Sequence, residues 1–291
     1  MRASPAKPIA FAILCIIWGS TWLAIKEGYG GLGAFNVASV RFFIAGPIML
    51  ALIPIMGTRL PRGRAEWLLT DWVGITLFTL DYGLVYWSEQ WLDTGLAAIV
   101  FAVFPVFTVI CAHVYLPDER LNARKLTGTL LAFAGVTALF ADSVRLDAAQ
   151  ARPILGMAAA AFFAALGSVA TKRHGHGIHP AGLNGPAMLI GAVLLMAASL
   201  ASGQGYALPH DHQSWFALTY LAIAGSIVTF LLYFWLLKSW DATTMSFISV
   251  FTPVTALILG YLARHEHPTV YTAVGGALIL SGVVLTATTG R

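Results

Sequence analysis

The chain has 291 residues, of which 58% are hydrophobic and 10% are charged, and its formal net charge is +4. Soluble proteins carry roughly a quarter charged residues, so this composition excludes an ordinary soluble domain. The basic residues fall between long apolar runs, and we interpret them as topology signals rather than as a nucleic-acid-binding surface.

The apolar runs are long enough to cross the hydrocarbon core of a membrane, which takes about 20 residues. They predict ten transmembrane helices, because lipid-exposed backbone must satisfy its own hydrogen bonds. The predicted spans are 9–26, 34–56, 67–89, 94–116, 123–141, 153–172, 180–201, 214–238, 243–263 and 269–288. The first run has no small-residue cleavage site and ends at Lys26-Glu27, so we expect a retained helix.

Lysine and arginine collect on one side of the predicted spans. The side that holds the N-terminus has twelve: Arg2, Lys7, Arg59, Arg62, Arg64, Arg120, Arg124, Lys125, Lys172, Arg173, Lys238 and Arg291. The opposite side has four: Lys26, Arg145, Arg152 and Arg264. The positive-inside rule therefore predicts that both termini are cytoplasmic, in a multi-pass protein of the bacterial inner membrane.

One pattern occurs twice, near the end of each half. It consists of an apolar run with a proline, a charged turn with a glutamate, and a second apolar run with two glycines. The first copy contains Pro105, Glu119, Gly128 and Gly135, and the second contains Pro253, Glu266, Gly275 and Gly282. The glutamate-to-glycine and glycine-to-glycine spacings agree, which indicates a duplicated helical hairpin.

The duplication divides the chain into residues 1–148 and 149–291, with five predicted spans each. Because five is odd, the second copy enters the membrane from the opposite side. Such inverted repeats occur in many secondary transporters, with the substrate site near the midplane between the halves. One chain holds both halves, so we expect a monomer to suffice for transport. Pro105 and Pro253 free backbone carbonyls and are expected to act as hinges.

Several of these residues resemble the EamA domain of the drug/metabolite transporter superfamily. They are Trp18-Gly19-Ser20-Thr21, Arg41-Phe42, Pro105, and Glu119-Arg120-Leu121 with its two downstream glycines. The resemblance covers nearly the whole chain. It implies an all-α integral membrane protein of ten helices around a central cavity, which exports amino acids, metabolites or drugs. The second half departs from the pattern, with His265-Glu266-His267-Pro268 in place of the Glu-Arg-Leu turn.

Asp81 is the sharpest candidate for a functional residue. It lies about 15 Å into the third span, near the midplane, at 1.5 Å per residue from Asp71. An ionised carboxylate there costs at least about 2.5 kcal/mol against lipid, so it should face a cavity or a partner. We interpret Asp81 as a substrate- or proton-binding group. The alternative is a protonated or hydrogen-bonded Asp that caps a helix irregularity, aided by Gly83.

Helical spacing places Phe78, Tyr82, Tyr86 and Glu89 on one stripe beside Asp81. An aromatic stripe often serves packing only. A tyrosine hydroxyl at membrane depth needs a partner, however, and a polar-lined cavity supplies one. We therefore expect the three aromatic residues to bind substrate.

Trp18 lies at the centre of the first span, where the aromatic belts at membrane interfaces do not explain it. With Thr21 nearby, it is placed to stack on an apolar or cationic substrate group, and helix packing is the alternative. At the repeat offset of 147–148, Trp18 corresponds to Leu166 and Asp81 to Val228. These polar and aromatic residues occur in just one of the two halves, and such residues suit a substrate that itself lacks two-fold symmetry.

Arg41 is the one basic residue that lies well inside a predicted span rather than near its end. As a substrate-binding residue it would take a carboxylate, or it would pair with Asp81 or Glu89. The alternatives are that it extends outward to the interface or donates to backbone carbonyls.

The sequence predicts no metal site, cofactor or enzymatic activity. The histidines at 174, 176 and 179 and at 210 and 212 lie in short loops without a full ligand set. An intramembrane enzyme would need clustered catalytic or ligating residues, and none is apparent. We expect an exporter of amino acids and related cationic or aromatic compounds that works by alternating access. The alternative is a nucleotide-sugar or other phosphorylated-metabolite carrier, which needs cations for the phosphates.

Overall fold

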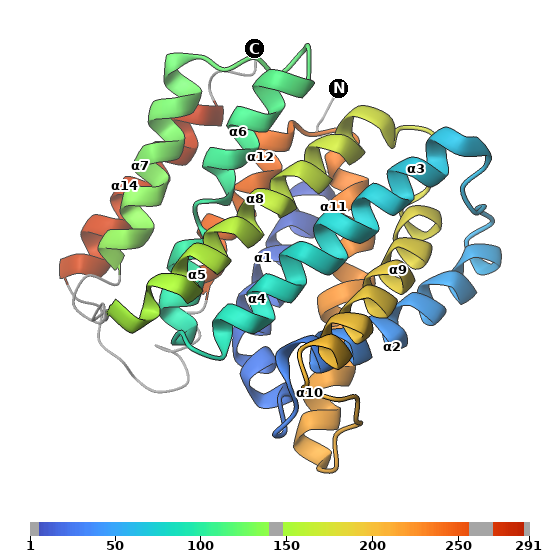
Figure 1. Ribbon diagram of the computed structural model, residues 1–291. Helices are drawn as coiled ribbons and strands as arrows, with labels where there is room; N and C mark the ends of the chain where they lie inside the picture. The colour runs from blue at the N-terminus through green and yellow to red at the C-terminus, as the bar shows by residue number, and fades with distance from the viewer. Residues whose placement is uncertain (1–5, 140–147, 256–269, 288–291) are drawn as a thin grey trace.

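The computed structural model describes residues 6–139, 148–255 and 270–287. Figure 1 shows one bundle of helices, in which α1 (Ala6–Gly28) begins and α14 (Val270–Ala287) ends at the same end. This end is called the N-terminal end below, and the other is called the opposite end.

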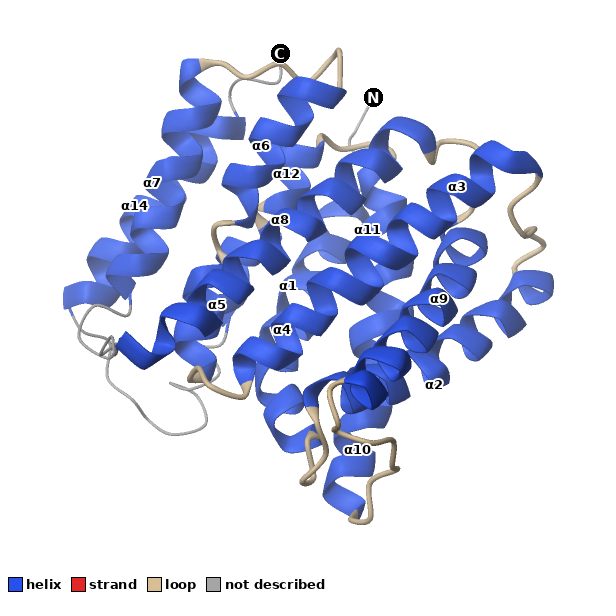
Figure 2. Cartoon of the chain, in the orientation of Figure 1, coloured by secondary structure: helices blue, strands red, loops and turns tan. Residues whose placement is uncertain are grey.

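Helices and their connecting loops make up the described ranges, which contain no strand (Figure 2). Within residues 6–139 α1 is followed by α2 (Ala34–Ile55), α3 (Gly63–Val73), η1 (Gly74–Asp81), α4 (Tyr82–Glu89), α5 (Thr94–Phe101), α6 (Phe104–Tyr115) and α7 (Ala123–Leu139). Within residues 148–255 the elements are η2 (Ala148–Gln150), α8 (Ala151–His174), α9 (Pro180–Ala201), α10 (His212–Ala222), η3 (Ile223–Val228), α11 (Thr229–Leu237) and α12 (Ala242–Ser246). The all-helical prediction is confirmed for this part of the chain.

Seven helical stretches among the described residues are long and apolar enough to cross a membrane. They are Ala6–Gly28, Ala34–Ile55, Gly63–Glu89, Thr94–Tyr115, Ala151–His174, Pro180–Ala201 and His212–Leu237. The predicted spans 123–141, 243–263 and 269–288 extend into residues outside the described ranges.

Two of the long stretches contain π-helical turns near their middle. In η1 the backbone N–H of Tyr82 donates to Leu77 O, and in η3 the N–H of Thr229 donates to Ala224 O. Both bonds reach back five residues instead of four, so the helix is wider there and its carbonyls are shifted. Such π turns are rare and are often found at functional sites.

The stretch 94–115 is interrupted between α5 and α6, and Pro105 lies in the first turn of α6. A similar interruption follows α12 at Phe247, after which residues 248–255 are helical and include Pro253. Proline has no N–H and fits a first helical turn best, which explains the position of Pro105. The roles of Pro105 and Pro253 as hinges stay predictions.

The duplicated glycines bring α7 and α14 together side by side (Figure 1). A Cβ atom added to Gly135 would lie 2.8 Å from Gly275 O, and one added to Gly275 would lie 2.7 Å from Gly135 O. Gly128 and Gly282 meet in the same way two helical turns along α7. Small residues let helix backbones approach closely in membranes, so the glycine spacing that marks the duplication has a packing function.

Gly135→Ala is expected to lower the thermal unfolding midpoint of the purified protein in detergent. The added methyl group forces the two backbones apart, and overpacking of this kind costs about 1–3 kcal/mol. The control is Gly276→Ala, because a Cβ atom at Gly276 meets nothing within 4 Å. Equal midpoints for the two variants would contradict the packing role of Gly135.

Candidate substrate cavity

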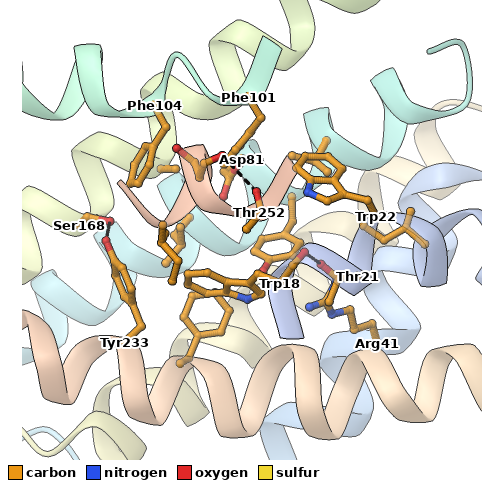
Figure 3. A pocket seen from close by; sticks show the side chains of 18 residues that line it. Trp18, Thr21, Trp22, Arg41, Asp81, Phe101, Phe104, Ser168, Tyr233 and Thr252 are labelled. Atoms are coloured by element: carbon orange, nitrogen blue, oxygen red, sulfur yellow. Dashed lines mark hydrogen bonds between the residues drawn. The ribbon is translucent and has the colours of Figure 1, made fainter. Parts of the chain in front are cut away.

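A central cavity of about 710 Å³, including its open mouth, lies among the long helices (Figure 3). Side chains of α1, α2, η1, α4, α5, α6, α8, α11 and the helical residues 248–255 line it. Its wall is mostly aromatic and aliphatic, with a few polar groups. Cavities with mostly apolar walls and a few polar groups hold small molecules in many proteins.

The cavity brings together five of the residues predicted to bind substrate: Trp18, Thr21, Arg41, Asp81 and Tyr82. The predicted residues Phe78 and Tyr86 are fully buried, but they are not among the residues that line it. Both stand behind the wall and support the side chains that do line it.

Phe78 packs edge-to-face against Phe42 and Phe230, with ring centroids 5.1 Å and 4.9 Å apart. Tyr82 lies edge-on to Phe42 at 5.0 Å and parallel to Phe78 at 6.3 Å. Aromatic pairs at such distances contribute about 0.5–1.5 kcal/mol beyond their buried area. Phe78 and Tyr82 of the predicted stripe are therefore in contact, but only Tyr82 lines the cavity, whereas Phe78 and Tyr86 lie in the core behind it.

Arg41 is 1% exposed and donates three hydrogen bonds within the protein. Its Nε donates to Ser226 Oγ at 2.8 Å, its Nη2 to Gly225 O at 2.8 Å, and its Nη1 to Tyr86 Oη at 3.2 Å. The guanidinium also lies 4.8 Å from the centre of the Tyr82 ring, within the range of a cation–π contact.

This arrangement decides among the interpretations of Arg41. The side chain donates to a backbone carbonyl, as one alternative predicted, and the prediction that it extends outward to the interface is wrong. Among the described residues neither Asp81 nor Glu89 lies within 4.0 Å of Arg41, so the predicted ion pair is not formed. Bonds to neutral acceptors leave the positive charge uncompensated by any carboxylate in direct contact.

The π turns of η3 explain why acceptors stand opposite Arg41. Gly225 O accepts from Arg41 Nη2, from Thr229 Oγ1 at 2.7 Å and from Trp18 Nε1 at 3.3 Å. A carbonyl inside a regular helix is occupied by the N–H four residues on, whereas a π turn displaces it. The sequence analysis did not identify Gly225 or Ser226 as part of the site. The one sequence signal that could have indicated them is the Gly225-Ser226 pair, which interrupts an otherwise apolar run.

Asp81 ends η1 and lines the cavity with an exposed fraction of 3%. None of the described protein groups makes a hydrogen bond to its Oδ1 atom. An unpaired carboxylate in an apolar environment is costly, and proteins compensate it with a partner or a proton. Asp81 therefore lines the cavity and has one buried carboxylate oxygen that no described protein group satisfies.

Glu89 is a second buried carboxyl group, two helical turns beyond Asp81. Neither of its oxygens makes a hydrogen bond to a described residue. The positive charges of Lys26 and Arg41 act on this carboxyl group, and Lys26 Nζ donates to Leu92 O at 2.6 Å. Glu89 does not line the cavity, and so it bears on the electrostatics of the site from outside.

Tyr233 and Ser168 border the cavity towards the N-terminal end of the bundle, where their hydroxyl groups meet at 3.0 Å (Figure 3). Tyr233 also packs against Trp18, with ring centroids 5.3 Å apart. Figure 3 shows Arg41 and Thr21 on the other side of the cavity. Trp22 and Phe101, which sequence reasoning missed, contact each other in the wall at 5.7 Å.

Beyond Tyr233, two charged residues bind the loop between α11 and α12. Lys172 Nζ donates to Leu237 O at 2.8 Å and to Trp240 O at 2.9 Å. The carboxylate of Glu119 accepts from the backbone N–H groups of Ala242 at 3.0 Å and Thr243 at 3.4 Å. The glutamate of the duplicated hairpin thus caps the start of α12. Its counterpart Glu266 lies outside the described residues.

The described residues contain no cluster of three histidine, cysteine, aspartate or glutamate side chains that would hold a metal ion. His179, one of the loop histidines, accepts a hydrogen bond from Ala181 N and caps the start of α9.

The chain matches the EamA-like transporter family over residues 7–141 and again over residues 151–288. The chain belongs to this family. It is a multi-pass membrane protein of the transporter class, within the drug/metabolite transporter superfamily.

Relatives of this EamA-family chain carry matching names. It is 27% identical to an uncharacterized transporter of Archaeoglobus fulgidus, over 96% of both chains. It is 30% identical to the uncharacterized inner membrane transporter YedA of Escherichia coli K12, over 89% of this chain and 84% of YedA. A crystal structure described only as that of a protein has the same fold, with a TM-score of 0.81, 20% identity and 99% of each chain covered.

Arg41→Lys is expected to destabilise this EamA-family protein by about 2 kcal/mol, measured as a lower unfolding midpoint in detergent. A lysine carries its three N–H donors on a single nitrogen, which cannot reach Ser226, Gly225 and Tyr86 at the same time, and a hydrogen bond to a charged group contributes about 1.5–3 kcal/mol. Arg124→Lys, at an exposed position on α7, is the matched control. A midpoint unchanged by Arg41→Lys would contradict the bonding role.

Glu119 gives a pH-dependent prediction, because burial raises the pKa of its carboxyl group above 4.5 although two backbone N–H groups oppose the shift. The folded protein then binds this proton more tightly than the unfolded chain. The resulting stabilisation is complete below pH 4.5 and is lost as the pH rises through the pKa of folded Glu119. The unfolding midpoint of the wild type should therefore fall relative to that of Glu119→Gln as the pH rises from 4.5. A difference that grows in the other direction would show that the pKa is lowered instead.

Proposed function

We propose that this protein exports small metabolites, chiefly amino acids including aromatic ones and related cationic or aromatic compounds, by alternating access. The observation that carries the proposal is the free Asp81 oxygen in a central cavity with aromatic walls. A substrate ammonium group is the chemical partner that such a carboxylate lacks.

The rest of the cavity wall suits the same class of substrate. Trp18, Tyr82 and Phe230 present ring faces and edges, which bind aromatic side chains and attract cations. Arg41 uses three of its donor groups within the protein and keeps its full positive charge. A zwitterionic amino acid would place its carboxylate towards Arg41 and its ammonium group towards Asp81.

Alternating access requires two halves that rearrange around a fixed site, and we infer an inverted repeat of residues 1–148 and 149–291. Three symmetric features support it. The contact between Gly128 and Gly282 is repeated by the contact between Gly135 and Gly275 at an offset of 147 residues. The π-helical turns end at Asp81 in one half and at Val228, at the same offset, in the other.

The third feature is a pair of analogous lysines at opposite ends of the bundle. Lys26 at the end of α1 donates to Leu92 O, which follows α4. Lys172 at the end of α8 donates to Leu237 O and Trp240 O, at the end of α11. Each lysine thus neutralises the negative carboxyl end of a helix in its own half, as expected for two similar units of opposite orientation.

The charge distribution supports cytoplasmic termini in the inner membrane. The presence of both proposed halves in one chain supports a monomer as the transport unit. The name of the Escherichia coli relative YedA is consistent with that membrane. A nucleotide-sugar or phosphorylated-metabolite carrier is the alternative function. Arg41 is the one basic residue that lines the central cavity among the described residues, which is few for a phosphate-bearing substrate.

Asp81→Asn is expected to weaken binding of cationic aromatic compounds at least about tenfold, the equivalent of about 1.4 kcal/mol. The measurement is thermal stabilisation of the purified protein across aromatic amino acids, viologens and sugar nucleotides, followed by transport into proteoliposomes at several pH values. The wild type should respond to the first two groups and not to the third.

Asp71→Asn is the matched control, because Asp71 is an exposed carboxylate on α3, outside the cavity. If Asp81→Asn keeps full transport with unchanged pH dependence, Asp81 binds neither substrate nor proton. Stabilisation by sugar nucleotides alone would favour the alternative function.

A further inference from the structure

A second groove lies on the outside of the bundle near its N-terminal end. Most of α3, the end of α6 and the last turns of α8 enclose about 1280 Å³, including the open mouth. It shares no lining residue with the central cavity. The groove is therefore separate from the central cavity.

The floor and sides of the groove are apolar. Val169 and Leu69 form buried parts of it, while Leu68 and Trp72 are 56% and 45% exposed along its edge. Exposed apolar surface of this kind is expected to contact hydrocarbon in a membrane protein.

The mouth of the groove is basic. Arg173 donates from Nη1 to Tyr115 O at 2.7 Å, and this bond fixes the guanidinium at the rim. Among the described residues, no group accepts a hydrogen bond from its Nε or Nη2, and His174 lies beside it at the rim. Tyr115 and Trp72 are aromatic residues of the kind that gather at membrane interfaces.

Glu66 is the one acidic residue that lines the groove, and its charge is already paired. Arg59 donates to both of its oxygens, at 2.7 Å and 2.8 Å, and Arg62 N donates at 2.6 Å. The rim therefore keeps a net attraction for anions. A phosphate diester would accept from the free donors of Arg173.

We propose that this groove binds an anionic phospholipid, with its phosphate at Arg173 and His174 and one acyl chain along Leu68, Leu69 and Val169. Basic pockets between transmembrane helices bind anionic headgroups in this way. The walls come from both matched copies of the family domain, since α3 and α6 belong to residues 7–141 and α8 to residues 151–288. A lipid seated there contacts both copies, and it stabilises the arrangement in which they form the groove.

The test compares phosphatidylglycerol with phosphatidylcholine of the same acyl chains, added to the full-length protein in mixed micelles. Phosphatidylglycerol should raise the unfolding midpoint more than phosphatidylcholine does, and native mass spectrometry should show it retained preferentially. Arg173→Gln should reduce this preference about fivefold, which corresponds to the contribution of about 1 kcal/mol from one basic residue near anionic lipid. Ala170→Trp, which fills the floor of the groove, should reduce retention of both lipids.

Arg124→Gln is the control, because Arg124 is exposed at the same end of the bundle but outside the groove. Equal effects of Arg124→Gln and Arg173→Gln would show non-specific attraction to anionic micelles and overturn the proposal. Equal retention of the two lipids by the wild type would overturn it as well. Stabilisation by inorganic phosphate alone, to the same extent as by phosphatidylglycerol, would show an adventitious ion only.

Discussion

The buried guanidinium of Arg41 is the interaction on which the centre of this protein depends. An arginine at membrane depth costs about 2.5–3.5 kcal/mol or more unless its hydrogen-bond donors are satisfied. Its partners come from α4 on one side, through Tyr86 Oη, and from η3 on the other, through Gly225 O and Ser226 Oγ. Helices from both halves of the chain must therefore stay within reach of one side chain, and the wall of the cavity forms where they meet.

The irregular helix η3 makes this possible, because a regular helix offers few free carbonyls. Its π turns direct Gly225 O towards three donors, and glycine at this position lets α1 and α2 approach. A Cβ atom there would lie 3.0 Å from Thr21 Cγ2 and 3.1 Å from Arg41 Nη2. The π turns of η1 end at Asp81 and carry the other charged group of the cavity. Both π-helical segments lie beside the charged side chains of the cavity, Arg41 and Asp81. Departures from regular local structure are expected at such functional positions.

The helices and the duplication were predictable from sequence because both follow from local signals, namely apolar run length and the repeated spacing of residues such as Gly128 and Gly135. The depth of Asp81 was predictable for the same reason. The neighbours of each side chain were not, since they depend on how helices far apart in the sequence rotate against one another. Tyr86 was therefore assigned to the cavity, although it lies behind the wall. Ser226 was not assigned to the site, because its partner Arg41 lies 185 residues away in the sequence and no local signal connects the two.

The symmetric and the singular residues divide the requirements of a transporter between them. In the proposed inverted repeat, the symmetry that exchanges the halves also exchanges the two glycine contacts between α7 and α14. This packing is therefore the same for both halves. Arg41 and Asp81 have no such counterparts, because residues 187–189 and Val228 are apolar at the corresponding places. A rearrangement that exchanges the roles of the halves then changes access to the cavity but leaves its charges in place. Substrate affinity would depend on the singular residues, and the balance between inward and outward states on the symmetric ones.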